Sequence, residues 1–220
     1  ISTGSLGLGG KAGIDYHPTA DDRYYLGYKL DPDRSNAFDE SSPLVGNDLG
    51  AIVLGANHRY SERLSVFAED TYDVFGRKRT LTQTYGVEYT PTAAWNISGG
   101  VEYGTVEDDT VNSTTGVQNS DFDRLALSAG AVYHGEGGFD GKLKGEFRRE
   151  RSDDGTRDRD TYLIGAGIGR QAGENWRFLA NIDAVLSDAT EDTLNGKYVE
   201  GSMGYAYRPV ETDALNALIK

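Results

Sequence analysis

The sequence predicts an all-β chain that forms one antiparallel up-and-down β-barrel domain over residues 1–220. Three observations lead to this prediction. Apolar and polar residues alternate in about a dozen segments. The connections between these segments alternate between short turns and mostly longer polar loops, and aromatic residues gather beside the short turns. No segment shows the spacing of an amphipathic helix, and no apolar run is long enough for a transmembrane helix.

Each predicted strand has one apolar parity and one small or polar parity. In the first, Leu8, Ile14 and Tyr16 share one parity, while Lys11 and Asp15 share the other. Residues 139–150 repeat this pattern, with Phe and Leu alternating with Lys and Glu. The predicted strands cover approximately residues 3–16, 24–31, 50–60, 64–75, 80–89, 95–105, 123–134, 139–150, 161–170, 176–187, 197–208 and 214–220.

Two kinds of connection alternate along the chain. The short, turn-like connections cover residues 17–23, 61–63, 90–94, 135–138, 171–175 and 209–213. The others are strongly polar and cover residues 32–48, 106–122, 151–160 and 188–196, with the short connection 76–79 as an exception in length. The chain is therefore predicted to be a meander whose two ends face different surroundings.

Aromatic residues begin or end most strands at the short turns. A water-soluble barrel has no use for such a girdle, because its apolar face points inward. A transmembrane barrel needs one at the lipid headgroups, together with short periplasmic turns and longer extracellular loops. The predicted aromatic girdle consists of Tyr16, Tyr24, Tyr60, Tyr89, Trp95, Tyr133, Phe139, Trp176 and Tyr207.

The opposite parity carries charged residues and glycines. A soluble core of this size could not bury so many unpaired charges, so this parity is predicted to face a lumen. Counting from the short turns places several carboxylates about 18 Å above the girdle, near the middle of the membrane. The predicted lumen acids are Glu69, Glu102, Glu146, Asp183 and Glu200, and the predicted lumen bases are Lys11, Lys29, Lys142, Lys144 and Arg148.

This pattern, with its repeated unit of tyrosine, turn and aromatic residue as in YTPTAAW (89–95), resembles Gram-negative outer-membrane β-barrels of the porin-like and receptor-like kind. The resemblance covers essentially the whole chain. It implies residence in the Gram-negative outer membrane, contacts with outer-membrane lipid and lipopolysaccharide, and insertion by the barrel-assembly machinery. Complete barrels of this group normally end in an aromatic residue. Lys220 departs from that rule, so we expect a segment of a larger barrel with further strands or domains of the same polypeptide; the alternative is closure by about 12 strands.

A ring of lumen carboxylates would favour cations in an open pore. The predicted function is thus a passive pore or transport channel for small, preferably cationic or neutral solutes. One alternative is a structural anchor or translocator barrel for a surface domain, in which the lumen bases pair with the acids and close the lumen. The other alternative is a soluble β-barrel that binds a ligand.

Other function classes find little support in the sequence. The net charge of −13 argues against nucleic-acid binding. No enzymatic activity is expected, because His17, His58 and His134 fit better as interfacial residues than as catalytic ones. No cofactor or metal is expected either. The glycine strings GLGGKAG (7–13) and GAGIG (165–169) do not open a helix, and the chain has no cysteine and no zinc-ligand spacing.

Overall fold

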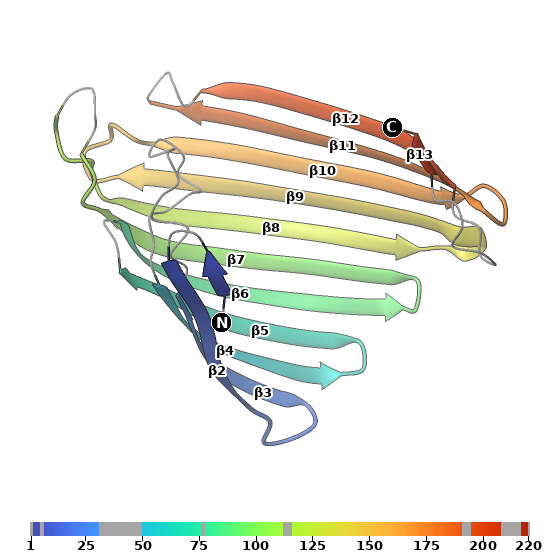
Figure 1. The fold of residues 1–220 in the computed structure, drawn as a ribbon, viewed down its shortest axis with the longest axis horizontal. Coiled ribbons are helices and arrows are strands. Elements are labelled where there is room, and N and C mark those ends of the chain that lie inside the picture. Colours follow the sequence, from blue (N-terminus) through green and yellow to red (C-terminus); the bar gives the residue numbers. More distant parts are fainter. Residues whose placement is uncertain are drawn as a thin grey trace.

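The structure is a computed structural model that describes residues 2–4, 7–30, 50–75, 78–111, 116–190, 195–207 and 217–219. These residues form a single 13-stranded sheet in which the strand order equals the sequence order, and every pair of neighbours is antiparallel (Figure 1). The prediction of an all-β, up-and-down architecture is confirmed. No helix in the described part of the chain is long and apolar enough to cross a membrane.

Eleven long strands, β2 to β12, make up most of the sheet, and the three-residue strands β1 and β13 lie at its edges. The strands are β1 (Ser2–Gly4), β2 (Gly7–Tyr16), β3 (Asp22–Leu30), β4 (Gly50–Ser61), β5 (Leu64–Phe75), β6 (Lys78–Thr92), β7 (Trp95–Asp108), β8 (Phe122–His134), β9 (Phe139–Ser152), β10 (Arg159–Gln171), β11 (Trp176–Ala189), β12 (Gly196–Tyr207) and β13 (Ala217–Ile219).

Several predicted boundaries need correction. The predicted strand 3–16 is divided, because the chain reverses and Gly4 pairs with Gly7 across β1 and β2. The strands beside two outer loops are also longer than predicted. β7 continues to Asp108 and β9 to Ser152, so the connecting loops are shorter than the polar sequence suggests. The polar composition of residues 106–108 and 151–152 predicts loops, although the hydrogen-bonded strand pairing continues through them.

The register gives the sheet two faces of opposite character. Cross-strand partners in an antiparallel ladder lie on the same face. Ile14 pairs with Leu26, and Leu26 with Leu54, on one face. On the other face Gly165 lies between Lys144 and Asp183. One parity is therefore mainly apolar and the other mainly polar or glycine from β2 to β12.

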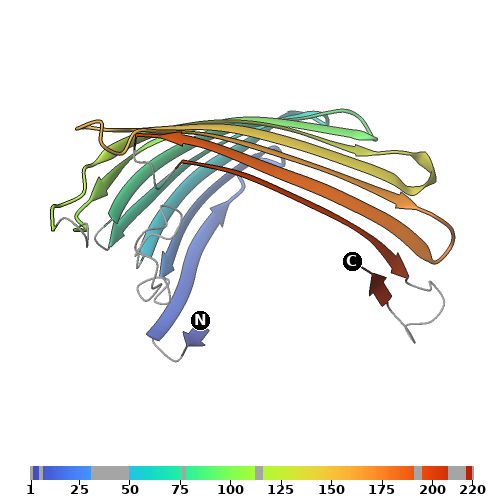
Figure 2. The same ribbon diagram turned by 90° about the horizontal axis from the view of Figure 1, so that it is seen from above.

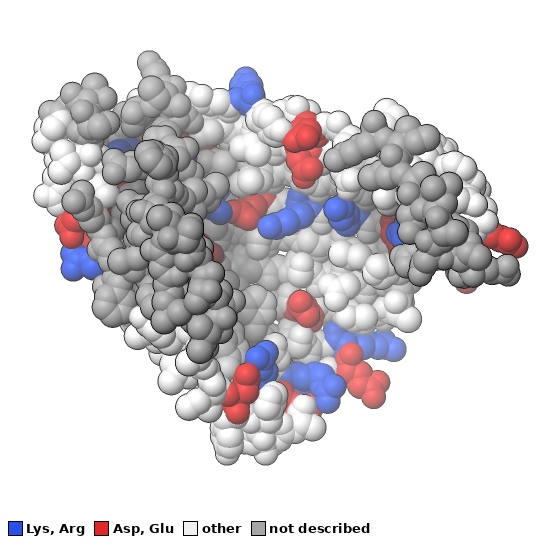
Figure 3. All heavy atoms as spheres, in the orientation of Figure 1, with Lys and Arg blue, Asp and Glu red and all other residues white. Residues whose placement is uncertain are grey.

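The sheet is strongly curved (Figure 2). Figure 3 looks onto its concave face, where basic and acidic side chains gather in the hollow. The opposite, outer face exposes large apolar side chains, among them Met203, Ile14 and Val199, with 73%, 69% and 68% of their surface accessible. Water would make such a continuous apolar surface a liability, whereas lipid requires it.

The two ends of the sheet also differ. The short turns lie together at one end of the strands and the longer connections at the other (Figure 1). One short turn contains a single 3-10 turn, Glu136–Gly138, in which Gly137 and Gly138 have φ of 67° and 69°. Only glycine adopts that backbone conformation without strain, so this tight reversal depends on both residues. The bond from the Gly135 amide to the Phe139 carbonyl, 2.7 Å long, closes the turn.

Candidate functional site: the charged inner face

The predicted girdle residues all lie on the outer face at the turn end of their strands. Neighbouring members touch: the rings of Trp95 and Tyr133 are 4.8 Å apart, and those of Trp176 and Tyr207 are 4.9 Å apart. Tyr16 and Tyr60 expose 62% and 66% of their surface. This arrangement has the geometry of an interfacial aromatic belt.

All five predicted lumen acids lie on the inner face, but most of them have a partner. The side chain of Tyr25 on β3 reaches across Gly55 of β4, and its hydroxyl donates a hydrogen bond to Glu69 on β5. Arg124 binds Glu102 at 2.6 Å. Arg148 binds Glu146 at 2.7 Å, and Lys144 approaches the same carboxylate at 3.6 Å. Three of the five carboxylates therefore belong to local polar pairs rather than to a ring of free charges.

Asp183 and Glu200 are different, because they lie directly opposite each other on β11 and β12. The described residues offer no basic partner to either carboxylate; Glu200 accepts a hydrogen bond from Tyr198. Like charges in directly opposed positions destabilise a sheet. The repulsion between these two exposed acids lowers the stability of the sheet, and the pair gives this part of the inner face a negative charge.

The predicted lumen bases differ in whether they form ion pairs. Lys142, Lys144 and Arg148 follow one another along β9 on the inner face. Arg148 and Lys144 pair with Glu146, whereas Lys142 has no ion pair with any described residue. The backbones of Lys11 and Lys29 are paired to each other in the sheet, but their side chains lie outside the described part of the chain.

Inward glycines leave room for large side chains of the neighbouring strand. The Tyr25 ring lies over Gly55, and the Phe67 ring lies over Gly86, in each case its direct partner in the ladder. A Cβ atom at either glycine would overlap the ring. The glycines are therefore part of the packing of the inner wall, a role that alternation alone does not reveal.

Sequence reasoning missed an ion-pair cluster at the loop end of β7 to β10. Arg157 binds the fully buried Asp108 at 2.8 Å and also donates to the Ser120 carbonyl at 3.3 Å. Arg159 binds the buried Glu150 at 2.7 Å. The Arg157 contacts join the β7–β8 connection to the β9–β10 connection, and the Arg159–Glu150 pair lies between β9 and β10. The acidic and basic residues can be seen in the sequence, but Arg157 and Asp108 are 49 residues apart and come together only through the pairing of the strands between them.

A second polar cluster orders the exposed part of the β9–β10 connection. Asp154 accepts hydrogen bonds from the Thr156 amide at 3.0 Å and from the Thr156 hydroxyl at 2.7 Å. These bonds, the backbone one first, lower the pKa of Asp154 below its ordinary value. Asp158 accepts from the Ser152 amide at 2.9 Å. The loop is thus held by its own carboxylates at neutral pH.

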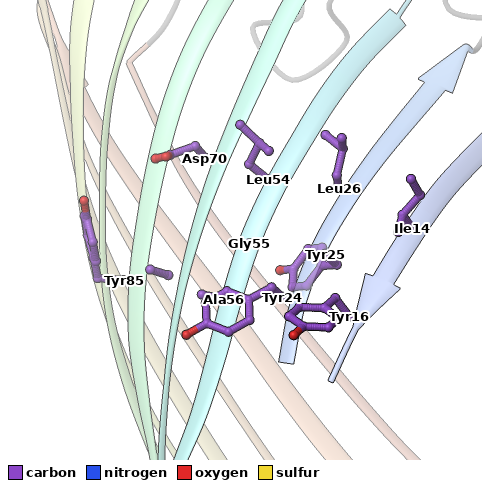
Figure 4. A pocket seen from close by; sticks show the side chains of 11 residues that line it. Ile14, Tyr16, Tyr24, Tyr25, Leu26, Leu54, Gly55, Ala56, Asp70 and Tyr85 are labelled. Carbon is purple, nitrogen blue, oxygen red and sulfur yellow. The ribbon is translucent and has the colours of Figure 1, made fainter. Parts of the chain in front are cut away.

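The outer face has one acidic residue within its apolar belt. Figure 4 shows Asp70 in line with Leu54, Leu26 and Ile14, which are its successive neighbours in the ladder. The carboxylate borders a hollow of about 440 Å³. Alternation predicts that this parity faces lipid, and Asp70 is an exception to the apolar pattern on it.

Replacing Asp70 by leucine is expected to raise the free energy of unfolding by about 1–2 kcal/mol, because a carboxylate that faces hydrocarbon is destabilising. Urea-induced unfolding in phospholipid vesicles measures the change. Asp123→Leu is the matched control, since Asp123 lies on the same face at the loop end of β8, where the expected gain is below about 1 kcal/mol. A lower stability of Asp70→Leu than of the unmodified chain would contradict the assignment of Asp70 to the lipid-facing side.

Two of the three histidines form carboxylate pairs at the turn end. His58 approaches Asp22 at 2.6 Å and packs edge-on against Tyr60, with ring centres 4.4 Å apart. His134 approaches Asp140 at 2.8 Å. Neither imidazole has a hydrogen bond to a described serine, and no group of three or more His, Asp or Glu residues suited to a metal ion occurs among the described residues.

Comparison with known proteins gives a structural likeness without a sequence relative. No protein-family model matches the chain, and no curated protein matches its sequence. The fold is similar to that of OmpT, an outer membrane protein of Vibrio cholerae solved after folding in vitro, with a TM-score of 0.59 and 13% sequence identity. The match covers 90% of this chain and 63% of that protein, so the chain spans less than two thirds of its length.

The likeness agrees with the curved up-and-down sheet. It also agrees with the outer-membrane location that the sequence predicts. The chain has the fold of a Gram-negative outer-membrane β-barrel.

Proposed function

We propose that the chain forms the wall of a passive diffusion pore for small solutes, preferably cationic or neutral ones. The observation that supports this proposal most is the difference between the two faces from β2 to β12: the concave face carries the lumen acids and bases and most of the glycines, while the outer face carries most of the large exposed apolar side chains. A lumen of this composition is wetted rather than packed. Outer-membrane lipid, lipopolysaccharide and the barrel-assembly machinery are the partners that this function requires.

A sheet that spans a membrane has to close on itself, because unpaired backbone groups are not tolerated in lipid. Among the described strands, β1 and β13 lie at the two edges and are not bonded to each other. The proposal therefore includes closure by further strands of the same polypeptide.

The preference for cations is assigned to Asp183 and Glu200. Glu102 and Glu146 are neutralised locally by Arg124 and Arg148, so they contribute less to the potential in the lumen than their positions alone suggest. The two opposed carboxylates of β11 and β12 have no such compensation from the described bases. Rings or pairs of free carboxylates favour cations in a pore.

The same ion pairs support a second candidate, a closed structural anchor for a surface domain. Arg124–Glu102 and Arg148–Glu146 are the kind of contact that would seal a narrow lumen. Conductance separates the two candidates, since an anchor with a sealed lumen carries no current. Neither candidate involves catalysis, and the His58–Asp22 and His134–Asp140 pairs are assigned to the interface at the turn end.

The test is incorporation of the complete polypeptide, with the strands that close the barrel, into planar bilayers. We expect stepwise conductance with a cation preference that falls in the double variant Asp183→Asn, Glu200→Gln. The same variant is expected to unfold at a slightly higher urea concentration, because the repulsion between the two carboxylates is removed. Conductance whose ion preference is unchanged in the double variant would contradict the role of this pair, and correctly folded protein without conductance would exclude the pore.

A further inference from the structure

The outer face of β5 and β6 carries two polar side chains within its apolar belt. Asp70 of β5 and Gln83 of β6 are direct partners in the ladder, and Leu54 flanks Asp70 on the same face. Asp70 lies six residues beyond Leu64, where β5 begins at the turn end. Six residues at about 3.4 Å, with a strand tilt of about 40°, correspond to about 16 Å within a lipid-facing band about 25 Å tall. Both side chains therefore lie at the depth of the hydrocarbon.

These two side chains have no ion pair or hydrogen bond with another described residue. The bases on the outer face of the described strands lie near the strand ends. Arg149, for example, lies ten residues beyond Phe139 and binds Asp160 at 3.2 Å. A carboxylate in hydrocarbon is costly unless it is paired, so an ionisable residue at this depth indicates a contact with another molecule.

A hollow of the outer face adjoins Asp70. Tyr24, Ala56, Ala68 and Tyr85 are successive partners in one row of the ladder. The two alanines form the floor, and the tyrosines lie on either side of it (Figure 4). Two depressions of about 440 and 540 Å³ share these four residues. Association within a membrane depends on close packing at small residues and on hydrogen bonds between polar ones, because lipid tails are as apolar as leucine. Both features occur side by side here.

The pair of Asp70 and Gln83 is complementary to a copy of itself. The ionised Asp70 carboxylate only accepts hydrogen bonds, whereas the Gln83 amide nitrogen donates two. In a two-fold symmetric interface the same patch meets itself, so that each member of a pair contacts the other member in the second copy. A two-fold axis along the membrane normal between these residues places each carboxylate opposite the amide of the other copy. Their depths nearly agree, because the side chains of ladder partners begin only about 5 Å apart.

We propose that the outer face of β5 and β6 is a self-association surface, through which two copies of the barrel pair in the membrane. Asp70 of each copy accepts a hydrogen bond from Gln83 of the other, and apolar side chains of the second copy fill the hollow over Ala56 and Ala68. Several strands flank β5 and β6 on both sides, so this surface remains accessible after closure of the barrel. The inference depends on the lipid-facing assignment and not on an open lumen.

Energy transfer between labelled copies tests the association. Donor-labelled and acceptor-labelled samples of the complete polypeptide, with the strands that close the barrel, are mixed in phosphatidylcholine vesicles and then diluted with lipid. Asp70→Leu and Gln83→Leu are each expected to weaken the dimer by about tenfold to hundredfold, because each removes two symmetry-related hydrogen bonds. Asp123→Leu is the matched control on the outer face of β8 and is expected to leave the association unchanged.

Two further variants test the two-fold arrangement. Gln83→Asp places carboxylates at both positions and is expected to abolish self-association, because like charges then oppose each other. Asp70→Gln places amides at both positions. An equal mixture of these two variants is expected to associate about as tightly as the unmodified polypeptide, since each amide again meets a carboxylate.

The outcomes separate this inference from the pore. Absence of energy transfer in the unmodified polypeptide at every lipid dilution would overturn the pairing, even if another membrane protein binds this surface. Equal effects of Asp70→Leu and Asp123→Leu, or a mixture of Gln83→Asp and Asp70→Gln that stays apart, would also overturn it. The stability gain expected for Asp70→Leu refers to separate copies, so this variant is expected to be more stable at high lipid dilution and yet to associate less. Conductance is measured on the same samples, and its presence or absence decides only the pore.

Discussion

Replacing Arg157 by alanine is expected to lower the free energy of unfolding by about 3 kcal/mol. Arg157 binds Asp108, whose side chain has no exposed surface, and it also stacks over the Phe122 ring at 5.3 Å. Removing one partner of a buried ion pair is strongly destabilising, because the remaining buried charge loses a large part of its compensation. Urea-induced unfolding in vesicles measures the loss, and the β7–β8 and β9–β10 connections should become cleavable by trypsin or a similar protease.

Arg79→Ala is the matched control at the same end of the sheet. Arg79 also forms two ion pairs, with Glu107 at 2.9 Å and Asp109 at 3.1 Å, but roughly half of each side chain is exposed. Exposed pairs contribute below about 1 kcal/mol. Equal losses in the two variants would show that burial of Asp108 contributes nothing to the strength of the Arg157 pair.

Gly55→Ala is expected to destabilise the chain by about 2 kcal/mol. The added methyl group would occupy the space of the Tyr25 ring, and overpacking of this kind typically costs about 1–3 kcal/mol. Displacing the ring also breaks the hydrogen bond from the Tyr25 hydroxyl to Glu69. The midpoint of urea unfolding in vesicles reports the change.

Gly145→Ala provides the matched control, since a Cβ at Gly145 meets no atom within 4 Å. It should leave the unfolding midpoint unchanged or raise it slightly, because alanine restricts the unfolded chain. Tyr25→Phe separates the two contributions at Gly55: it removes only the hydrogen bond, worth about 1 kcal/mol. A Gly55→Ala variant as stable as Gly145→Ala would mean that the Tyr25 ring does not lie over Gly55.

Alternation in the sequence was sufficient to predict the strands and their two faces. Lipid on one side and water on the other select residues at every second position, so the pattern survives without any knowledge of partners. The division between β1 and β2 was not predictable in this way, because glycine and serine around Gly4 fit a strand as well as a reversal. A short turn within a glycine-rich segment leaves no change in periodicity.

The candidate site was predictable only in part. Counting from the turns brings Glu102 and Glu146 to the inner face, but it does not reveal their partners. Arg124 is 22 residues from Glu102, and Arg157 is 49 residues from Asp108. Such pairs depend on the register of two neighbouring strands and on the bends at their ends. In the sequence of a polar connection, a charged residue that is buried cannot be distinguished from one that is exposed to solvent.

The agreement between strand order and sequence order has an evolutionary consequence. Each long strand bonds only to the strands before and after it in the chain. Duplication or deletion of a hairpin therefore adds or removes two adjacent strands, while the other strands keep their hydrogen-bonded neighbours. The width of such a barrel can change by small genetic steps, one hairpin at a time.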